Sequence, residues 1–224
     1  MREGYYSARL SGERLKACYE LAPPRVQRYL RAEIQFVRGF LDLKHTVVEL
    51  GCGYGRVLRA LIGHTGRVIG VDSSRQSLEM ARSLLRFARN CDLLRMDAVH
   101  LGLASDSIDA VVCIQNGISA FHVDPAQLVR ESLRVTRPGG RCLFSSYSDE
   151  FWEERLEWFR RQSAAGLLGN IDWDATGDGT IVCDDGFTAT TLGREEFNAL
   201  TADLGVESRV QEVDASSLFC VIRK

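Results

Sequence analysis

The sequence lacks several features that would each point to a particular class of protein. It has no apolar run approaching the roughly 20 residues that cross a bilayer. Its first six residues, MREGYY, lack the apolar stretch of a secretory signal. Its seven cysteines are scattered singly, with no C-x-x-C pair, which disfavours a structural zinc site or a disulfide framework. These absences predict a cytoplasmic protein that is not bound to a membrane and holds no metal.

Positive charge is also too scarce to indicate a nucleic-acid partner, because 28 Lys and Arg against 30 Asp and Glu give a formal net charge of −2. The charge is unevenly placed, however. Residues 1–40 carry eight basic and four acidic side chains, whereas residues 148–186 carry ten acidic and three basic ones. Both segments are typical of solvated surfaces. The acidic segment alternatively indicates a cover over an active site that favours a cationic or amine substrate.

The 224 residues, 45% of them hydrophobic, suit one globular domain. From residue 46 onward, short apolar runs alternate with segments of helical period. The runs that predict strands are Thr46–Leu50, Arg67–Asp72, Asp92–Met96, Ile108–Ile114 and Arg141–Tyr147, and the expected helices are Arg56–Gly63, Ser74–Ala88 and Pro125–Thr136. Continuous apolar strands separated by helices indicate an α/β fold with a parallel, doubly wound sheet that binds its ligand at the carboxyl ends of the strands.

The core comprises residues 45–147. The segments on either side of it do not continue its alternation of strands and helices. Residues 193–224 predict a helix and two strands joined by a turn too short for a crossover, so these strands should be antiparallel. Residues 1–44 predict a helical cap. Residues 148–192 predict an inserted helix and a hairpin, which would act as a lid. The expected whole is a single domain around a seven-stranded, mostly parallel sheet with an antiparallel last strand.

The strongest motif is the glycine-rich turn E-L-G-C-G-Y-G, residues 49–55, between the first strand and its helix. Glycine is needed where the chain takes a positive φ or comes within van der Waals reach of a ligand. The spacing excludes two alternatives. A dinucleotide-binding turn, G-x-G-x-x-G, would place a glycine where this chain has Arg56, and the G-K-[ST] of a phosphate-binding loop is absent.

A carboxylate ends each of the next two strands. Asp72 ends the second strand 21 residues after Gly51, where an acid can accept hydrogen bonds from the hydroxyls of a ribose. The alternative is an N-cap of the next helix, a role that Ser73 or Ser74 could serve instead. Asp97 ends the third strand, where a carboxylate can accept a hydrogen bond from the exocyclic amine of an adenine. A plain loop aspartate is the alternative there.

Together with Ile108–Ile114 and the L-R-V-T-R-P-G-G run at residues 133–140, these motifs resemble the class I S-adenosylmethionine (SAM)-dependent methyltransferase family. The resemblance covers roughly residues 45–147 and the closing strand pair. It implies the Rossmann-like fold of that family and SAM as the cofactor, with S-adenosylhomocysteine as the product. The cofactor-binding residues that it implies are Glu49, Gly51, Cys52, Gly53 and Gly55 in the turn, Asp72 and Ser73 at the ribose, Asp97 and Ala98 at the adenine, and Gln115 beside the methionine moiety.

The expected reaction sets few demands on the protein, because the sulfonium of SAM carries the difficult chemistry. The protein must hold a nucleophile in line with the methyl carbon and exclude water. A hydroxyl or acidic carbon would also need a general base, for which His122 is the candidate, although a loop histidine is often structural or solvated. The candidate substrate-binding residues are Tyr5, Tyr6, Asn116, Tyr147 and Trp152.

For the pair Tyr5 and Tyr6, and for Trp152, the alternative role is packing within the core or between helices. The pair Tyr5 and Tyr6 resembles aromatic residues that close over SAM in small-molecule members of the family. Trp152 shares one face of the inserted helix with Leu156 and Phe159, as the floor of a substrate pocket would require, and such a stripe is also typical of core packing.

The acceptor is expected to be a small molecule, with an amine nitrogen favoured over oxygen or sulfur. The C-I-Q-N-G-I-S stretch at residues 113–119 lacks the [DN]-P-P-[YF] signature of methylases that act on base amines, which argues against a nucleic-acid partner. We expect a monomer or homodimer. Two other hypotheses are a SAM-binding sensor or accessory protein without catalysis and a nicotinamide-dependent oxidoreductase, and Arg56 speaks against the second.

Overall fold

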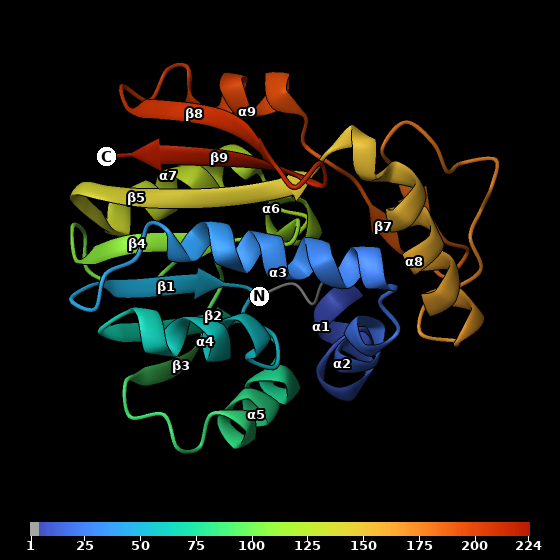
Figure 1. Ribbon diagram of the computed structural model, residues 1–224, viewed down its shortest axis with the longest axis horizontal. Coiled ribbons are helices and arrows are strands. Elements are labelled where there is room, and N and C mark those ends of the chain that lie inside the picture. Colours follow the sequence, from blue (N-terminus) through green and yellow to red (C-terminus); the bar gives the residue numbers. More distant parts are fainter. Residues whose placement is uncertain (1–4) are drawn as a thin grey trace.

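The computed structural model describes residues 5–224 and is built on a seven-stranded sheet of order β3-β2-β1-β4-β5-β9-β8 (Figure 1). Neighbours among β1 to β5 pair in parallel, and β9 runs antiparallel to both β5 and β8. The predicted doubly wound sheet with an antiparallel last strand is therefore confirmed. The strands are β1 (Thr46–Leu50), β2 (Arg67–Asp72), β3 (Cys91–Arg95), β4 (Ile108–Cys113), β5 (Thr136–Tyr147), β8 (Glu207–Val213) and β9 (Ser217–Arg223).

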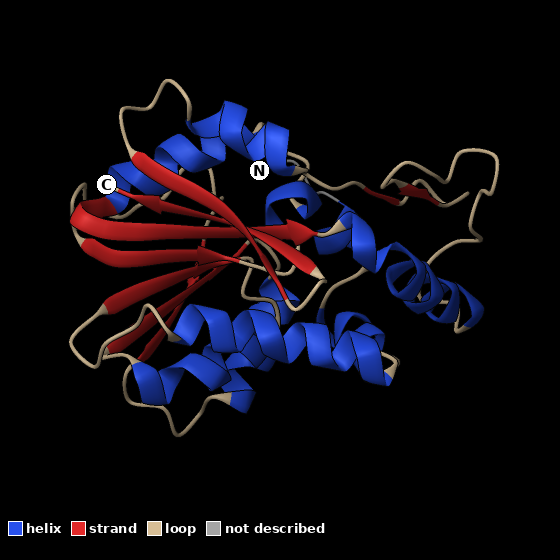
Figure 2. Ribbon diagram, turned by 45° about the horizontal axis from the view of Figure 1, so that its top comes forward, coloured by secondary structure: helices blue, strands red, loops and turns tan. Residues whose placement is uncertain are grey.

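Helices cover both faces of the sheet (Figure 2). Successive residues of a strand point to opposite faces, so Val47 packs with one helical layer and Val48 with the other. The Val47 side is covered by α3 (Pro24–Arg38), α4 (Arg56–Leu61) and α5 (Arg75–Leu84), and the Val48 side by α7 (Pro125–Val135) and α9 (Arg194–Thr201). Short 3₁₀ turns follow α4 at Ile62–His64 and precede α8 at Asp149–Phe151.

A third apolar cluster lies at the carboxyl ends of the parallel strands, where the N-terminal helices meet the segment between β5 and α9. Trp158 donates from Nε1 to the carbonyl oxygen of Cys18 at 2.8 Å, and Arg9 forms an ion pair with Asp185. The two segments therefore form a single cover over that end of the sheet, visible at the right of Figure 1. The elements involved are α1 (Tyr5–Arg9), α2 (Gly12–Glu20), the start of α3, α8 (Trp152–Ala164), β6 (Ile181–Val182) and β7 (Thr188–Ala189).

Several bounds differ from the expectations. The strand β5 begins at Thr136 rather than Arg141, and α4 ends at Leu61 rather than Gly63. The helix α5 ends at Leu84 rather than Ala88, and Asn90 in the following loop donates to the carbonyl oxygens of Ile62 and Thr65. A four-residue helix that the sequence pattern did not predict, α6 (Gly117–Ala120), follows β4 because the backbone reverses in a left-handed turn just before it.

Residues 1–4, which belong to the expected cap and to the stretch examined for a secretory signal, lie outside the described residues. Within residues 5–224 no helix combines the length and apolar character needed to span a membrane. The same residues contain no cluster of three or more His, Cys, Asp or Glu side chains placed to hold a metal ion.

Candidate active site

A cavity of about 540 Å³ opens at the carboxyl ends of the parallel strands, beneath the cover formed by α1, α2 and α8. The residues at the ends of β1, β2 and β3 line one part of it, which we call the cofactor half. Aromatic side chains from the cover and from the end of β5 line the other part, which we call the acceptor half. The cavity brings together most of the residues expected to form the site: Tyr5, Tyr6, Glu49, Gly51, Gly53, Asp72, Ser73, Asp97, Ala98, Gln115, His122 and Tyr147.

The glycine-rich turn forms the floor of the cofactor half. Gly51, Gly53 and Gly55 have φ values of 71°, 52° and 90°, a region that favours glycine. A Cβ atom on Gly51 would lie 2.6 Å from the ring of Phe121, so the ring fits only against a bare backbone.

Two members of the turn do not line the cavity. Gly55 caps α4 and faces Ala81 of α5 and Leu85, which directly follows that helix. The side chain of Cys52 is buried on the sheet side, against Gly70, and its N–H donates to the carbonyl oxygen of Val71 at 3.0 Å. The side chain of Cys52 and the Cβ position of Gly55 therefore face other parts of the protein rather than a ligand.

Asp72 connects the second strand to the glycine turn. Its carboxylate accepts hydrogen bonds from the N–H groups of Gly53 and Ser74, each at 2.8 Å. Burial raises the pKa of Asp72, and these backbone donors oppose the rise. The N-cap of α5 is Ser74, whose hydroxyl accepts from the N–H of Ser77. Asp72 is therefore left facing the cavity while it also holds the turn in shape.

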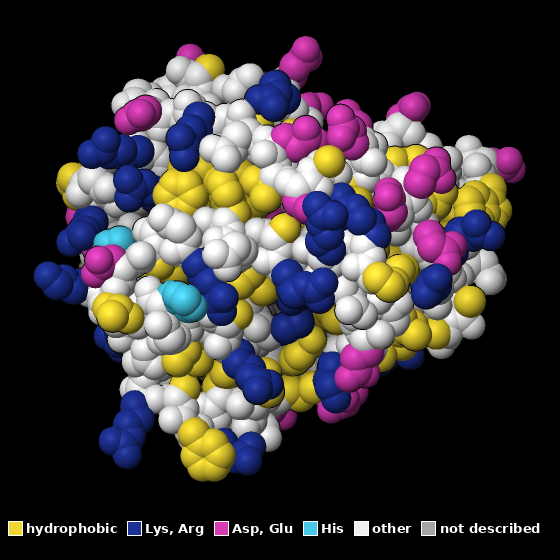
Figure 3. Space-filling view, in the orientation of Figure 1, with side chains coloured by type: hydrophobic (Ala, Val, Ile, Leu, Met, Phe, Trp, Pro, Cys, Tyr) yellow, Lys and Arg dark blue, Asp and Glu magenta, His cyan; other side chains and the backbone are white. Residues whose placement is uncertain are grey.

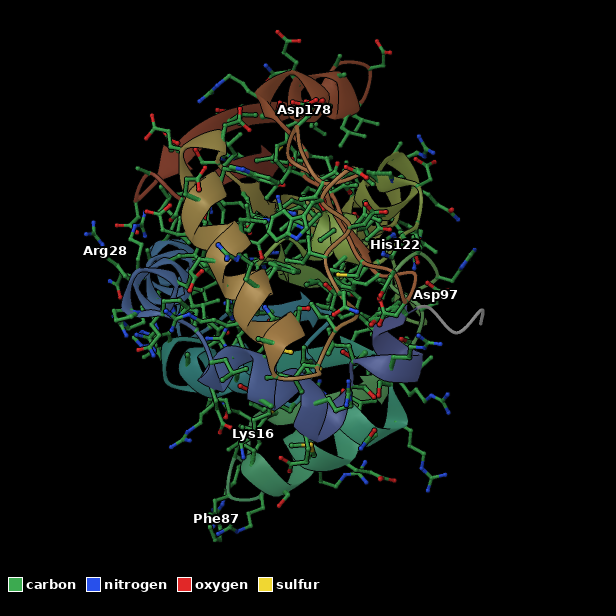
Figure 4. The ribbon with its side chains drawn as sticks, turned by 90° about the vertical axis from the view of Figure 1, so that its right-hand side faces the viewer. Lys16, Arg28, Phe87, Asp97, His122 and Asp178 are labelled. Carbon is green, nitrogen blue, oxygen red and sulfur yellow. The ribbon has the colours of Figure 1, made fainter. Side chains whose placement is uncertain are left out.

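The end of β3 and the loop after α6 form the rim of the cofactor half. Asp97 accepts a hydrogen bond from the N–H of Val99 at 3.1 Å. His122 is exposed, has a φ of 52°, and lies on the same side of the molecule as Asp97 in Figure 4, and both residues line the cavity. The ring of Phe121, which sequence reasoning missed, lines the cavity between the rim and the glycine turn.

A buried polar network lies where the two halves meet. Glu49 is only 4% exposed, and its Oε2 has no hydrogen-bond partner among the described residues. Burial raises the pKa of Glu49 to about 8, although the nearby guanidinium of Arg56 opposes this. Arg56 donates to Oε1 of Gln115 and stacks over the ring of Tyr19 at 4.5 Å, while Nε2 of Gln115 is also buried without a partner in residues 5–224.

Glu33, on α3, fixes the backbone of this network. Its fully buried carboxylate accepts a hydrogen bond from the N–H of Gln115 at 2.7 Å, and Ser145 accepts a second one from the same N–H at 2.9 Å. Gln115 and Asn116 both have positive φ, 58° and 61°, so these contacts hold a left-handed bend that turns Gln115 into the cavity. Sequence reasoning missed Glu33. The feature that could have indicated its role is the position of a carboxylate on the apolar face of α3.

The acceptor half is lined mainly by aromatic rings. Tyr5, Tyr6 and Tyr147 were expected there, and Tyr19, Trp158 and Phe159 join them. Tyr5 is held in place by a hydrogen bond from its hydroxyl to the carboxylate of Asp185.

Asn116 and Trp152, two further residues expected at the substrate, do not line the cavity. Asn116 is 5% exposed, donates to the carbonyl oxygen of Thr190 and accepts from Ser146, so it joins the end of β4 to the segment before α9. The buried face of α8 carries Arg155, Trp158, Phe159 and Gln162, which leaves Trp152 at its margin.

Most acidic side chains of residues 148–186 are exposed on the outside of the cover, although Asp185 also accepts the hydrogen bond from Tyr5. Asp149, Glu150 and Glu153 are exposed, and Figure 3 shows acidic side chains spread over this part of the surface. Among the described residues that line the cavity, the carboxylates are those of Glu49, Asp72 and Asp97, and none comes from the insertion. The acidic segment therefore forms a solvated surface of the protein.

Residues 48–144 match the family model described as a methyltransferase domain. These residues form a class I SAM-dependent methyltransferase domain.

Its relatives include the methyltransferase GfsG of Streptomyces halstedii, 39% identical over 138 residues that cover 57% of this chain and 49% of GfsG. An arsenite methyltransferase of Aquipseudomonas alcaligenes is 33% identical over 141 residues, which cover 57% of this chain and 40% of that protein. The chain thus spans half or less of the length of these relatives. The DhpI-SAM-HEP complex has the same fold, with a TM-score of 0.65 and 21% identity over 98% of this chain and 94% of that one.

The matched segment of the methyltransferase domain carries the cofactor half of the cavity, from Glu49 to Gln115. It excludes α1, α2 and α8, which supply Tyr6, Tyr19, Trp158 and Phe159 to the acceptor half. The acceptor half is therefore built largely from segments outside the family pattern, and its chemistry has to be inferred from this chain alone.

Proposed function

We propose that the methyltransferase domain binds SAM in the cofactor half of the cavity and transfers its methyl group to a small-molecule acceptor in the other half. The observation that carries this proposal is the pair of buried, unpartnered polar atoms, Oε2 of Glu49 and Nε2 of Gln115. Buried polar groups are almost always hydrogen-bonded, so two such atoms on one cavity wall suit a polar ligand. The amino-acid end of SAM carries both a donor and an acceptor and would satisfy them.

The other residues of the cofactor half fit the remaining parts of SAM. The bare backbone at Gly51 and Gly53 leaves room for close approach of the cofactor. The carboxylate of Asp72, with Ser73 beside it, would accept hydrogen bonds from the ribose hydroxyls. Asp97 and Ala98 would hold the adenine. When bound, SAM supplies the activated methyl group and its leaving group.

The chain contributes positioning and the exclusion of water. Gln115, whose backbone N–H donates to the carboxylate of Glu33, would orient the methionine moiety. The helices α1, α2 and α8 would shield the reacting atoms from solvent. His122 stays a candidate general base for a hydroxyl acceptor, to be tested by substitution.

The acceptor atom is a separate part of the proposal. An amine nitrogen stays a prediction that rests on the acidic insertion, and the outward position of those acids weakens its support. Because one relative is an arsenite methyltransferase, the acceptor atoms of the relatives are not confined to nitrogen. The aromatic lining supports a small, largely apolar acceptor.

Incubation of the purified protein with methyl-labelled SAM and a fractionated extract of small metabolites tests the proposal. We expect label to appear in at least one metabolite, and Asp72→Ala to abolish its transfer. If SAM binds and no fraction is labelled, the second candidate, a SAM-binding protein without catalysis, replaces the first. Tight binding of NADH without binding of SAM would overturn both.

A further inference from the structure

The acceptor half of the cavity is lined without any charged side chain, as far as residues 5–224 show. The carboxylates that line the cavity, and His122, belong to the cofactor half and its rim. The walls of the acceptor half are mainly the rings of Tyr6, Tyr19, Tyr147, Trp158 and Phe159. This lining bears on the class of acceptor, an inference that rests on the proposed methyl transfer.

The rings of this wall pack against one another. Tyr19 lies 5.9 Å from Trp158, and Trp158 lies 5.9 Å from Phe159, between ring centroids. The indole N–H of Trp158 already donates to the carbonyl oxygen of Cys18 at 2.8 Å, so Trp158 offers a ligand only its ring. Such a wall suits a flat molecule, because stacked and edge-on ring contacts stabilise binding beyond the burial of apolar area.

The tyrosine hydroxyls show that this environment disfavours negative charge. Burial raises the pKa of Tyr6, Tyr19 and Tyr147 and is the largest cause of the rise in each of them. The guanidinium of Arg155 opposes the rise at Tyr6 and Tyr147 without overcoming it. These three hydroxyls are therefore neutral at physiological pH, and a bound anion would meet the same penalty.

Positive charge is disfavoured in the same surroundings. Arg155 is 1% exposed and stacks over the ring of Tyr147 at 4.5 Å, outside the lining of the cavity. Burial is also the largest cause of the lowered pKa of Arg155. A cationic acceptor would enter this region without a carboxylate to pair with, because no described residue of the acceptor half supplies one.

One neutral polar side chain, that of Gln162, stands among the rings. It follows Trp158 by four residues and Phe159 by three on α8, so the three share one face of the helix. Gln162 lines the cavity and is only 3% exposed, and its side-chain amide makes no hydrogen bond to another described residue. Buried polar groups are almost always hydrogen-bonded, so this amide suits a polar group of a ligand.

The chemistry of that ligand group follows from the amide and from its surroundings. A glutamine amide offers two N–H donors and one carbonyl acceptor. It can therefore pair with an amide, carbonyl or hydroxyl group. An ion loses far more than a neutral group when it leaves water for a site that lacks an opposite charge.

We propose that the acceptor is an uncharged, largely apolar molecule that lies with a flat face against Trp158 and Phe159 and forms a hydrogen bond from a neutral polar group to Gln162. Gln162 is then a residue that determines specificity rather than a catalytic one. An amine acceptor fits this site only in its unprotonated form.

Three probes of nearly the same shape test the preference for a neutral molecule. At neutral pH benzamide is uncharged, benzoate is an anion and benzamidine is a cation. The protein is first saturated with S-adenosylhomocysteine, which lacks the sulfonium charge, so that the titrations measure the preference of the protein itself. We expect calorimetry to show saturable binding of benzamide, at least tenfold tighter than that of either ion.

A substitution on α8 tests the role of Gln162. Gln162→Leu removes the amide at similar volume and should weaken benzamide binding by about twofold to tenfold, the effect of one hydrogen bond. Toluene, which forms no hydrogen bond, should bind this variant at least as tightly as it binds the wild type. The matched control is Gln35→Leu, the same change at an exposed position of α3, and it should alter neither affinity.

The outcomes separate this inference from the proposed function. If S-adenosylhomocysteine binds but benzamide does not, or if either ion binds as tightly as benzamide, the inference of a neutral acceptor is overturned and methyl transfer stands. That comparison needs no variant, so it decides even if Gln162→Leu does not fold. If Gln162→Leu folds and either keeps its affinity for benzamide or loses affinity for toluene as well, Gln162 does not determine specificity. If S-adenosylhomocysteine itself does not bind, the proposed function falls too.

Discussion

Two glycines with the same backbone strain allow a matched test of the glycine turn. Gly51 and Gly139 have φ values of 71° and 80°. Alanine at such a φ costs about 1–2 kcal/mol in the folded state, offset by about 0.4–1 kcal/mol from lower entropy of the unfolded chain. From the backbone conformation alone, each Gly→Ala variant should therefore lose about 1 kcal/mol of unfolding free energy, or roughly 2–4 °C in Tm for a chain of this size.

The two positions differ in what the added methyl group meets. At Gly139 a Cβ atom finds nothing within 4 Å, whereas at Gly51 it lies 2.6 Å from the Phe121 ring. The ring must retreat by about 0.8 Å to reach an ordinary contact of 3.4 Å, and the ring is part of the cavity wall. We expect Gly51→Ala to weaken binding of S-adenosylhomocysteine at least tenfold, about 1.4 kcal/mol, and Gly139→Ala to leave it unchanged.

Calorimetric titration of both variants, with thermal melts of the same samples, decides the matter. If Gly51→Ala folds and binds S-adenosylhomocysteine as tightly as Gly139→Ala does, the glycine turn is not where the cofactor binds. A loss of affinity in both variants would mean that the effect comes from global stability rather than from the turn.

Three further predictions concern single side chains of the site. Asp72→Asn removes the charge from about one hydrogen bond to the ribose, and such a bond is worth about 1.5–3 kcal/mol. Calorimetry should therefore show at least tenfold weaker SAM binding. Unchanged affinity would remove the ribose assignment. Because burial raises the pKa of Glu49 to about 8, ionisation at higher pH should strengthen binding of the cationic cofactor between pH 7 and 9. The same raised pKa makes the unliganded fold lose stability as pH rises from about 4.5 through 8. Both the binding trend and the stability trend should vanish in Glu49→Gln. If either trend persists in that variant, the carboxyl of Glu49 is not its cause. His122→Ala should lower turnover by about 100-fold with unchanged cofactor affinity if His122 is a general base, and turnover within twofold of the wild type eliminates that role.

Local patterns predicted the core of the fold well, because each element is specified by its own residues. The bounds of β1 and β2 agree with the apolar runs Thr46–Leu50 and Arg67–Asp72. A glycine or an acid ends each run, so the strand ends could be placed from sequence. The cavity accordingly contains the expected residues at the ends of β1 to β4.

What the sequence did not predict depends on contacts between distant segments. The buried face of α8 includes Arg155, whose guanidinium donates to carbonyl oxygens 24 and 34 residues away along the chain. Glu33 meets the N–H of Gln115 across 82 residues. A charged residue on a helix is ordinarily expected to face solvent, and only the tertiary structure shows which of these are buried and paired. The acceptor half was for this reason the least predictable part of the site.

The proposed function depends on a nucleoside site that fits SAM, formed by the first strand–helix turn and the carboxylates at the ends of the next two strands. Isothermal titration of the purified protein, freed of carried-over ligand, with S-adenosylhomocysteine and separately with NADH tests this most directly. We expect saturable heat with one site per chain for the first and none for the second. If neither S-adenosylhomocysteine nor SAM gives heat, the cavity is not a SAM site.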